Sequence, residues 1–290
     1  MSKRKAASGD DPFSPPPTRS QPAPGIRVGV GGWTYAPWRG GMFYPEGLVQ
    51  RRELEYASRR LNSIEVNGTY YGAQKPATYA KWRDETPDGF VFSVKAPMRI
   101  MQSKQLSKTG HQVEDFIGGI VELGEKLGPI VWQFDEDRPL DRGAFPEFLD
   151  LLPAKHGKHR LRHVLDVRVV EFVDSAYVAL AREHGMATVF TDSEEHPSFA
   201  DLTADFVYAR LMRSQAGIEA GYPDAELDLW AERALLWSEG GDPMDLPHIG
   251  AVAQQAKPRE VFLYFISSAK ERNPSAAMAL LKRLGAINHQ

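Results

Sequence analysis

Eight short segments of β type follow one another along this chain, and most are separated by stretches with the pattern of a helix. Strands that alternate with helices indicate a parallel sheet, because a parallel return needs a crossover of about a dozen residues or more. Eight such units in about 265 residues favour a closed barrel over an open sheet. We therefore predict one α/β domain, a (β/α)₈ TIM barrel with its chemistry at the carboxyl ends of the strands. The predicted strands are Ile26–Gly32, Ser63–Tyr70, Phe90–Lys95, Ile130–Phe134, His163–Arg168, Thr188–Asp192, Phe206–Leu211 and Val261–Ile266.

The composition fits a single globular domain. The chain has 290 residues, of which 42% are hydrophobic and 25% charged, and a formal net charge of −3. That charge argues against general attraction to nucleic acid, although a local basic patch is compatible with it. The absence of cysteine excludes disulfides and thiolate chemistry. No apolar run approaches the roughly 20 residues that span a bilayer, and no secretory signal is visible, so we expect a cytoplasmic protein with no membrane partner.

The first residues differ in composition from the rest. Residues 1–25 are rich in proline and begin with the basic triplet Lys3, Arg4 and Lys5. Such a segment has almost nothing to bury, so we expect a disordered tail before a barrel domain over residues 26–290. The triplet could contact nucleic acid or a partner, but a solvated tail is the favoured interpretation.

One stretch of the second predicted strand resembles the hallmark of a known family. Supporting stretches follow in the family's order, and together they cover roughly residues 26 to 285. On these motifs the chain resembles the YecE-like proteins, catalogued as domain of unknown function seventy-two. The resemblance implies a TIM-barrel fold and no established activity. The hallmark is Ile64-Glu65-Val66-Asn67-Gly68-Thr69-Tyr70-Tyr71-Gly72, followed by Lys81-Trp82, Thr86-Pro87-Asp88-Gly89-Phe90, Phe92-Ser93-Val94-Lys95-Ala96-Pro97, Leu127-Gly128-Pro129, Tyr208-Ala209-Arg210-Leu211, Tyr222, Leu229-Trp230-Ala231 and Val261-Phe262-Leu263-Tyr264-Phe265.

The chain departs from the family's pattern at four predicted strand ends. The family usually has Ile-Thr-His after the third strand, Glu-x-Arg-His around the fifth, Arg-Leu-His-Gly at the seventh and Phe-Asn-Asn after the eighth. Here these are Ile100-Met101-Gln102, Asp166-Val167-Arg168-Val169, Arg210-Leu211-Met212-Arg213 and Phe265-Ile266-Ser267. If the family's chemistry uses the missing histidine and asparagine side chains, this member is altered or inactive.

Polar side chains gather where the predicted strands end. Lys95, Arg168 and Arg210 would bind an anion, because guanidinium groups grip phosphate or carboxylate and lysine adds a point charge. Three acids would then serve as catalytic acid or base. The alternative is a closed network of ion pairs, which we favour for Asp166 with Arg168 alone. For the whole group of polar residues at the strand ends, we favour a functional site over an ion-pair network. Its predicted catalytic residues are Glu65, Asp192 and Asp166, and its predicted binding residues are Asn67, Tyr70, Lys95, Gln133, Arg168, Tyr208, Arg210 and Trp33.

Glu65 and Asn67 are the strongest pair in this set, because residues two apart on a strand face the same way. A charged side chain inside an apolar strand is costly unless it is paired or placed at the barrel mouth. The alternative is a carboxylate hydrogen-bonded to neighbouring backbone. In the first interpretation the amides of Asn67 and Gln133 orient the substrate.

No cofactor is predicted. The acids could hold Mg²⁺ or Mn²⁺, but the eight histidines lie mostly outside predicted strand ends, so we disfavour a divalent metal. A Schiff-base role for Lys95 needs a desolvated amine, and the nearby carboxylates argue against it. The run from Gly29 to Gly32 lacks the spacing of a dinucleotide-binding motif, and neither a nucleophilic serine elbow nor a P-loop is visible.

Three functions remain open from the sequence. The leading one is an enzyme performing acid–base chemistry, of hydrolase, lyase or isomerase type, on a small anionic substrate that contains phosphate or sugar. The second is a nucleic-acid-binding barrel, in which Trp33, Tyr35 and Trp38 stack on bases; the same aromatic cluster could instead be a lid packed on the barrel rim. The third is a catalytically degenerate interaction scaffold, suggested by the missing histidine and asparagine residues.

Overall fold

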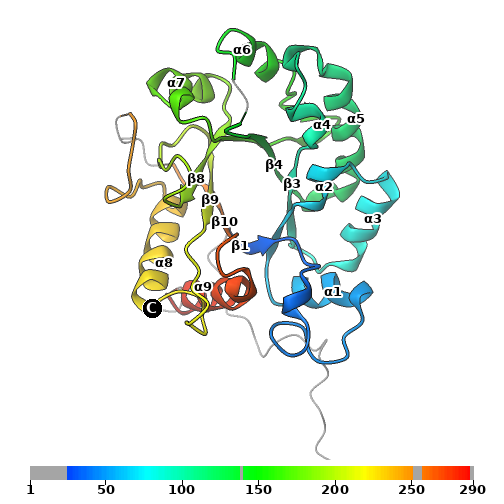
Figure 1. Cartoon of the computed structure of the whole chain (residues 1–290), viewed down its shortest axis with the longest axis vertical. Helices are drawn as coiled ribbons and strands as arrows, with labels where there is room; N and C mark the ends of the chain where they lie inside the picture. Colours follow the sequence, from blue (N-terminus) through cyan, green and yellow to red (C-terminus); the bar gives the residue numbers. More distant parts are fainter. Residues whose placement is uncertain (1–24, 138–139, 251–256, 288–290) are drawn as a thin grey trace, which may run out of the picture.

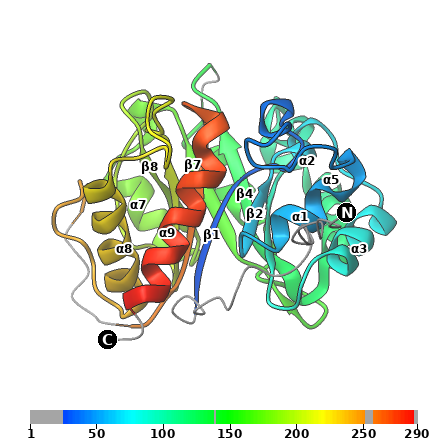
Figure 2. The ribbon, with the colours of Figure 1, turned by 90° about the horizontal axis from the view of Figure 1, so that it is seen from below.

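The centre of the molecule is a closed barrel of eight parallel strands, seen from two directions in Figures 1 and 2. This computed structural model describes residues 25–137, 140–250 and 257–287, so the predicted tail lies outside the described residues except for Gly25. Each barrel strand pairs with the next in the chain, and the last closes on the first, which confirms the predicted TIM barrel. The strands are β1 (Ile26–Gly31), β2 (Ser63–Val66), β3 (Val91–Lys95), β4 (Leu127–Phe134), β7 (His163–Val167), β8 (Ala187–Asp192), β9 (Phe206–Leu211) and β10 (Glu260–Phe265).

Helices surround the barrel on its outer side (Figure 1). The return from β8 to β9, residues 193–205, is described throughout and holds no helix. In the part of the chain that the structure describes, no helix is both long and apolar enough to cross a membrane. The helices are α1 (Glu53–Ser58), α2 (Gly68–Tyr71), α3 (Pro76–Glu85), α4 (Met98–Met101), α5 (Gly110–Ile120), α6 (Ala144–Leu149), α7 (Ser175–Glu183), α8 (Asp224–Ser238) and α9 (Asn273–Ile287). The 3₁₀ turns are η1 (Ala36–Trp38), η2 (Gln50–Arg52), η3 (Leu106–Lys108), η4 (Val121–Lys126), η5 (Val170–Phe172) and η6 (Lys270–Arg272).

Two apolar clusters divide the buried side chains. Because successive strand residues point to opposite faces, one set of each strand lines the barrel and the other packs under the helices. The larger cluster joins strands to helices and includes Trp38, Trp132 and Trp237. The smaller cluster fills the barrel and consists of Val91, Val131, Val164, Ala187, Val189, Phe206, Tyr208, Phe262 and Tyr264. The lower barrel is thus a packed core, and only its carboxyl end can hold a site.

The structure corrects the ends of two predicted strands and adds one hairpin that was not predicted. The second strand does not reach Tyr70 but ends at Val66, because the chain turns into α2. Thr69 fixes that turn, since its hydroxyl hydrogen-bonds to the carbonyl oxygens of Val66 and Lys95. The fourth strand begins at Leu127, three residues earlier than predicted. A small antiparallel hairpin of β5 (Lys155–His156) and β6 (His159–Arg160), which the sequence did not predict, precedes β7.

Candidate functional site

A layer of hydroxyl groups crosses the middle of the barrel. Ser63 on β2 shares a hydrogen bond of 2.7 Å with Tyr264 on β10, and Ser93 on β3 shares one of 2.9 Å with Tyr208 on β9. Neither strand pair is adjacent in the sheet, so both bonds run through the interior. Neither serine was predicted as a site residue from the sequence, and nor was Tyr264. The available signal was a serine two residues before Glu65 and before the lysine that ends β3, on the same face of each strand.

Arg210 joins two carboxylates across the barrel, one layer nearer its mouth. Its Nε donates to Glu65 Oε2 at 3.0 Å, and its Nη1 donates to Asp166 Oδ2 at 2.5 Å. Tyr208, two residues earlier on the same strand, also donates to Glu65 Oε2, at 2.5 Å. None of the three charged residues is more than 4% exposed. The structure therefore brings four predicted site residues, from β2, β7 and β9, into one buried network.

Charge balance keeps this network ionised. Burial lowers the pKa of Arg210, but the charges of Glu65 and Asp166 outweigh it and raise that pKa above its ordinary value. Burial likewise raises the pKa of Asp166, yet Arg210 and Arg168 hold it below the ordinary range. Arg168 donates to Asp166 at 3.3 Å, which is the local pair expected from the sequence. Both acids thus serve first to hold the arginine in place.

Lys95 ends β3 at the same mouth but pairs with no carboxylate. Within the described residues its Nζ forms no ion pair, and it lies 4.2 Å from the centre of the Tyr70 ring. Burial, aided by the neighbouring charge of Arg210, lowers the pKa of Lys95 to about 8. The charges of Glu65 and Asp166 oppose that shift, but the ion pairs of both carboxylates are with Arg210 and not with Lys95. The amine is therefore far easier to deprotonate than an ordinary lysine.

Several polar atoms at the mouth have no partner in the described part of the chain. Arg210 Nη2 and Arg168 Nε are buried without a hydrogen bond, and so is Gln133 Oε1. A buried donor without a partner is costly, and more so on a charged group. Together with the unpaired amine of Lys95, the two guanidinium nitrogens are suited to an incoming anion.

Asp135, one residue past the end of β4, belongs to this mouth, although it was not among the site residues predicted from the sequence. It accepts a hydrogen bond of 2.6 Å from the Tyr70 hydroxyl and another from Gln133 Nε2. Its position two residues after Gln133, at the end of a buried strand, was the available signal. Two predicted binding residues are thus held in place by one carboxylate.

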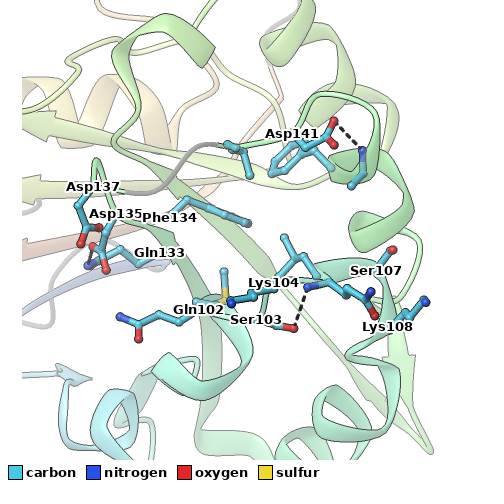
Figure 3. A pocket seen from close by; sticks show the side chains of 16 residues that line it. Gln102, Ser103, Lys104, Ser107, Lys108, Gln133, Phe134, Asp135, Asp137 and Asp141 are labelled. Atoms are coloured by element: carbon cyan, nitrogen blue, oxygen red, sulfur yellow. Dashed lines mark hydrogen bonds between the residues drawn. The ribbon is translucent and has the colours of Figure 1, made fainter.

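A cleft of about 640 Å³ opens beside the mouth, between the segments that follow β3 and β4. Figure 3 shows Gln133 and Asp135 on one side of it and Ser107 and Lys108 on the other. Its volume lies in the range of small-molecule sites, roughly 300–1,000 Å³. Many of its lining side chains end in amide, hydroxyl, amine or carboxylate groups, which suits a ligand rich in hydroxyls.

Asn67 and Asp192 were also predicted as site residues, but they lie outside the network around Arg210. Asn67 follows the end of β2, so the expectation that it shares a strand face with Glu65 is wrong. Its amide nitrogen lies over Gly31, where a Cβ atom would approach it to 2.7 Å, so glycine leaves room for that side chain. Asp192 pairs with Arg213 at 2.9 Å instead, and burial raises its pKa.

The aromatic cluster after β1 packs mainly against the protein. Trp38 is fully buried, and its Nε1 donates to the carbonyl oxygen of Lys270 at 2.8 Å. Trp33 packs edge-on against Trp82, with ring centres 5.0 Å apart. Tyr35 lies under the Lys270 amine, which is 4.6 Å from its ring centre. These contacts favour the lid interpretation over a stacking platform for bases.

Metal ligands are not grouped in the described ranges, where no three His, Asp or Glu side chains could hold an ion together. His163 on β7 illustrates how a strand histidine is used. Its Nδ1 accepts a hydrogen bond of 3.0 Å from Trp132, and its Nε2 donates to the Pro153 carbonyl oxygen at 2.8 Å. Burial lowers the pKa of His163 to about 4. Both ring nitrogens are therefore engaged in hydrogen bonds within the protein.

Comparison with known proteins gives one consistent result. The family model described as "Protein of unknown function DUF72" matches residues 27–290. The UPF0759 protein YecE of Escherichia coli (strain K12) is 29% identical over 251 residues, which cover 79% of this chain and 88% of YecE. YecE of Escherichia coli O157:H7 is 25% identical over 255 residues, with the same coverage.

Solved structures agree on the fold. A DUF72 family protein from Thermotoga maritima MSB8 superposes with a TM-score of 0.66 at 18% identity, covering 91% of this chain and 99% of its own. A DUF72 family protein from Enterococcus faecalis V583 gives a TM-score of 0.64 at 16% identity, with 89% and 95% covered. At these identities the likeness extends to the barrel and not to its chemistry.

Proposed function

The chain belongs to the DUF72 family, and within it we propose that this protein is an enzyme that binds a small phosphate- or carboxylate-bearing substrate at its barrel mouth and performs acid–base chemistry on it. The observation that carries the proposal is a set of cationic nitrogens at one mouth. Among the described residues, Arg210 Nη2 and Arg168 Nε are buried without a hydrogen bond, and Lys95 Nζ lies over the Tyr70 ring without an ion pair. They occur at the end of the barrel where TIM-barrel enzymes hold their substrates.

The residues divide into distinct roles. Arg168 and Arg210 bind the anion, since guanidinium groups match phosphate and carboxylate oxygens. Glu65 and Asp166 position Arg210, to which both are bound. Lys95 exchanges the proton, because a group with a pKa of about 8 changes its protonation state close to neutral pH.

The adjoining cleft takes the uncharged part of the substrate. Gln133 and Asp135 border both the mouth and the cleft, so one molecule can contact the two at once. Amide and hydroxyl groups in the cleft can hydrogen-bond to the hydroxyls of a sugar. A phosphorylated sugar is therefore the substrate class that fits both the cationic mouth and the cleft. Asp192, the third acid predicted to be catalytic, lies at the rim, where it pairs with Arg213.

Calorimetric titration with inorganic phosphate tests the anion site, with Arg168→Gln and Arg213→Gln compared with the parent. Both arginines come from loops at the carboxyl end of the barrel, but Arg213 is exposed and binds Asp192 and Glu194. We expect Arg168→Gln to weaken phosphate binding about tenfold or more, the value of one charged hydrogen bond. Arg213→Gln should leave it unchanged.

Turnover is then measured with a panel of phosphorylated sugars, followed by NMR, and should be lost in Lys95→Met. Equal phosphate affinity in both arginine variants would overturn the proposal. Binding of oligonucleotides alone, fading steeply with added salt, would replace it with nucleic-acid recognition. No binding of either class would favour the interaction scaffold.

A further inference from the structure

Lys95 combines three features that activate a lysine as a nucleophile. It ends a barrel strand at the mouth, its amine has no ion pair in the described residues, and a second cation, Arg210, lies close enough to act on its charge. Desolvation and a neighbouring positive charge are the two conditions that favour the neutral, nucleophilic form of a lysine. Acid–base work alone does not require an amine, so the choice of lysine here calls for its own explanation.

We infer that Lys95 is a covalent catalyst that condenses with the aldehyde or ketone carbon of the anionic substrate and holds it as an imine. The inference rests on the proposed anion site and narrows its substrate class to phosphorylated or carboxylated carbonyl compounds. Arg168 and Arg210 hold the anionic group while Lys95 reaches the carbonyl carbon. Glu65 and Asp166 form their ion pairs with Arg210, so in the described residues neither forms an ion pair with the amine, although the charges of both still act on it.

The chemical step balances without any further reactant. The nitrogen lone pair of neutral Lys95 forms a bond to the carbonyl carbon, and the C=O π pair moves to oxygen. That oxygen takes up one of the two protons of the attacking nitrogen, which gives a neutral carbinolamine with one N–H proton. The carbinolamine then loses its hydroxyl group and the nitrogen proton as water, leaving a C=N bond. At pH 7 an amine with a pKa of about 8 is neutral in roughly one molecule in ten, against roughly three in ten thousand for an ordinary lysine.

Borohydride trapping tests the inference on the full chain. The probe is glycolaldehyde phosphate, compared with glycolaldehyde, which has the same carbonyl and no anionic group. Sodium borohydride reduces the imine to a stable secondary amine, which intact mass and peptide mapping then locate. We expect one adduct, at Lys95, formed with the phosphorylated probe at about tenfold lower concentration than with the neutral probe.

Two variants make the result specific. Lys95→Arg keeps the positive charge but cannot form an imine, so it should lose the adduct while inorganic phosphate still binds. Lys270→Met removes another lysine that lies over a tyrosine ring and should leave the Lys95 adduct unchanged. Excess inorganic phosphate should suppress labelling of the parent protein.

Labelling spread over Lys104, Lys108 and Lys270, with no preference for Lys95, would overturn the inference. If phosphate binds and depends on Arg168 but Lys95 stays unlabelled, the imine is refuted and the anion site stands. If phosphate does not bind and both probes label Lys95 alike, the proposed anion site fails, and the phosphate-bearing substrate class inferred from it fails too.

Discussion

Two lysines at the carboxyl end of the barrel lie over tyrosine rings, and only one of them has the surroundings of a reactive group. Lys95 is 4.2 Å from the centre of the Tyr70 ring, and Lys270 is 4.6 Å from that of Tyr35. Burial lowers the pKa of both, but at Lys95 the charge of Arg210 adds to the effect. The ring contact is thus a common packing arrangement, and the difference lies in the neighbouring ion-pair network.

That network explains why a carboxyl-rich mouth can still contain a free amine. Arg210 donates to Glu65 and to Asp166, so each acid already has a cationic partner. At Lys270 the lowered pKa comes from burial alone, and the amine forms no ion pair with any residue that the structure describes. The same residue type is therefore a packing element at one rim position and a candidate catalyst at the other.

Removal of Arg210 tests whether its ion-pair network is what distinguishes Lys95 from Lys270. In Arg210→Met both acids lose their buried cation, so we expect the free energy of unfolding to fall by about 3–5 kcal/mol in urea titrations. The freed carboxylates should then pair with Lys95, so its labelling should fall while that of Lys270 does not change.

Arg283 supplies the matched control, because it also bridges two acids, Asp224 and Asp228, but at the surface of α8 and α9. Arg283→Met should cost only about 0–1 kcal/mol. If the free energy of unfolding falls equally in the two variants, burial does not make the Arg210 ion pairs more important for stability than those of Arg283 at the surface.

A second test compares Lys95→Met with Lys270→Met across pH. The pKa of Lys95 is about 8 in the folded protein and 10.5 when unfolded, so the unfolded chain binds more protons between these values. The stability of the parent should therefore rise from pH 8 to 10.5, and the cost of burying the charge is fully present at pH 7. Lys95→Met should then gain about 1–3 kcal/mol at pH 7, fading as the pH approaches 10.5.

Lys270→Met should gain less over the same range, because no second cation acts on that amine. Unfolding in urea at closely spaced pH values measures both curves. A stability loss in Lys95→Met at pH 7 would mean that its ring contact outweighs the charge burial. If Lys95 has a functional role, it can be retained even though burying its charge lowers the stability of the fold.

The sequence predicted the strands because their pattern is local. Alternating apolar residues and a helical crossover between strands are visible within short windows, and all eight barrel strands were located. The ends of the strands were predicted less accurately than their positions. The turn at Gly68, for example, depends on a hydrogen bond from Thr69 to a carbonyl oxygen of β3, which lies far away in the chain.

The candidate site was predicted as a set of residues and not as a set of contacts. Glu65, Asp166 and Arg210 were named from their positions at strand ends, but their pairing depends on which side chains meet across the barrel. The sequence grouped Asp192 with them, whereas Arg213, from the loop after β9, holds it at the rim. Asp135 was missed for the same reason, since its role comes from Tyr70.

Removal of the hydroxyl group should change stability only slightly, and differently for Tyr70 and Tyr35. The Tyr70 hydroxyl donates to Asp135 at 2.6 Å, whereas the Tyr35 hydroxyl has no hydrogen bond among the described residues. Tyr70→Phe should therefore lower the free energy of unfolding by about 1 kcal/mol, and Tyr35→Phe should change it little. Both variants keep the ring, so trapping of Lys95 by glycolaldehyde phosphate should persist in each. Loss of trapping in Tyr70→Phe alone would assign the hydroxyl, and not the ring, as the group that positions the amine.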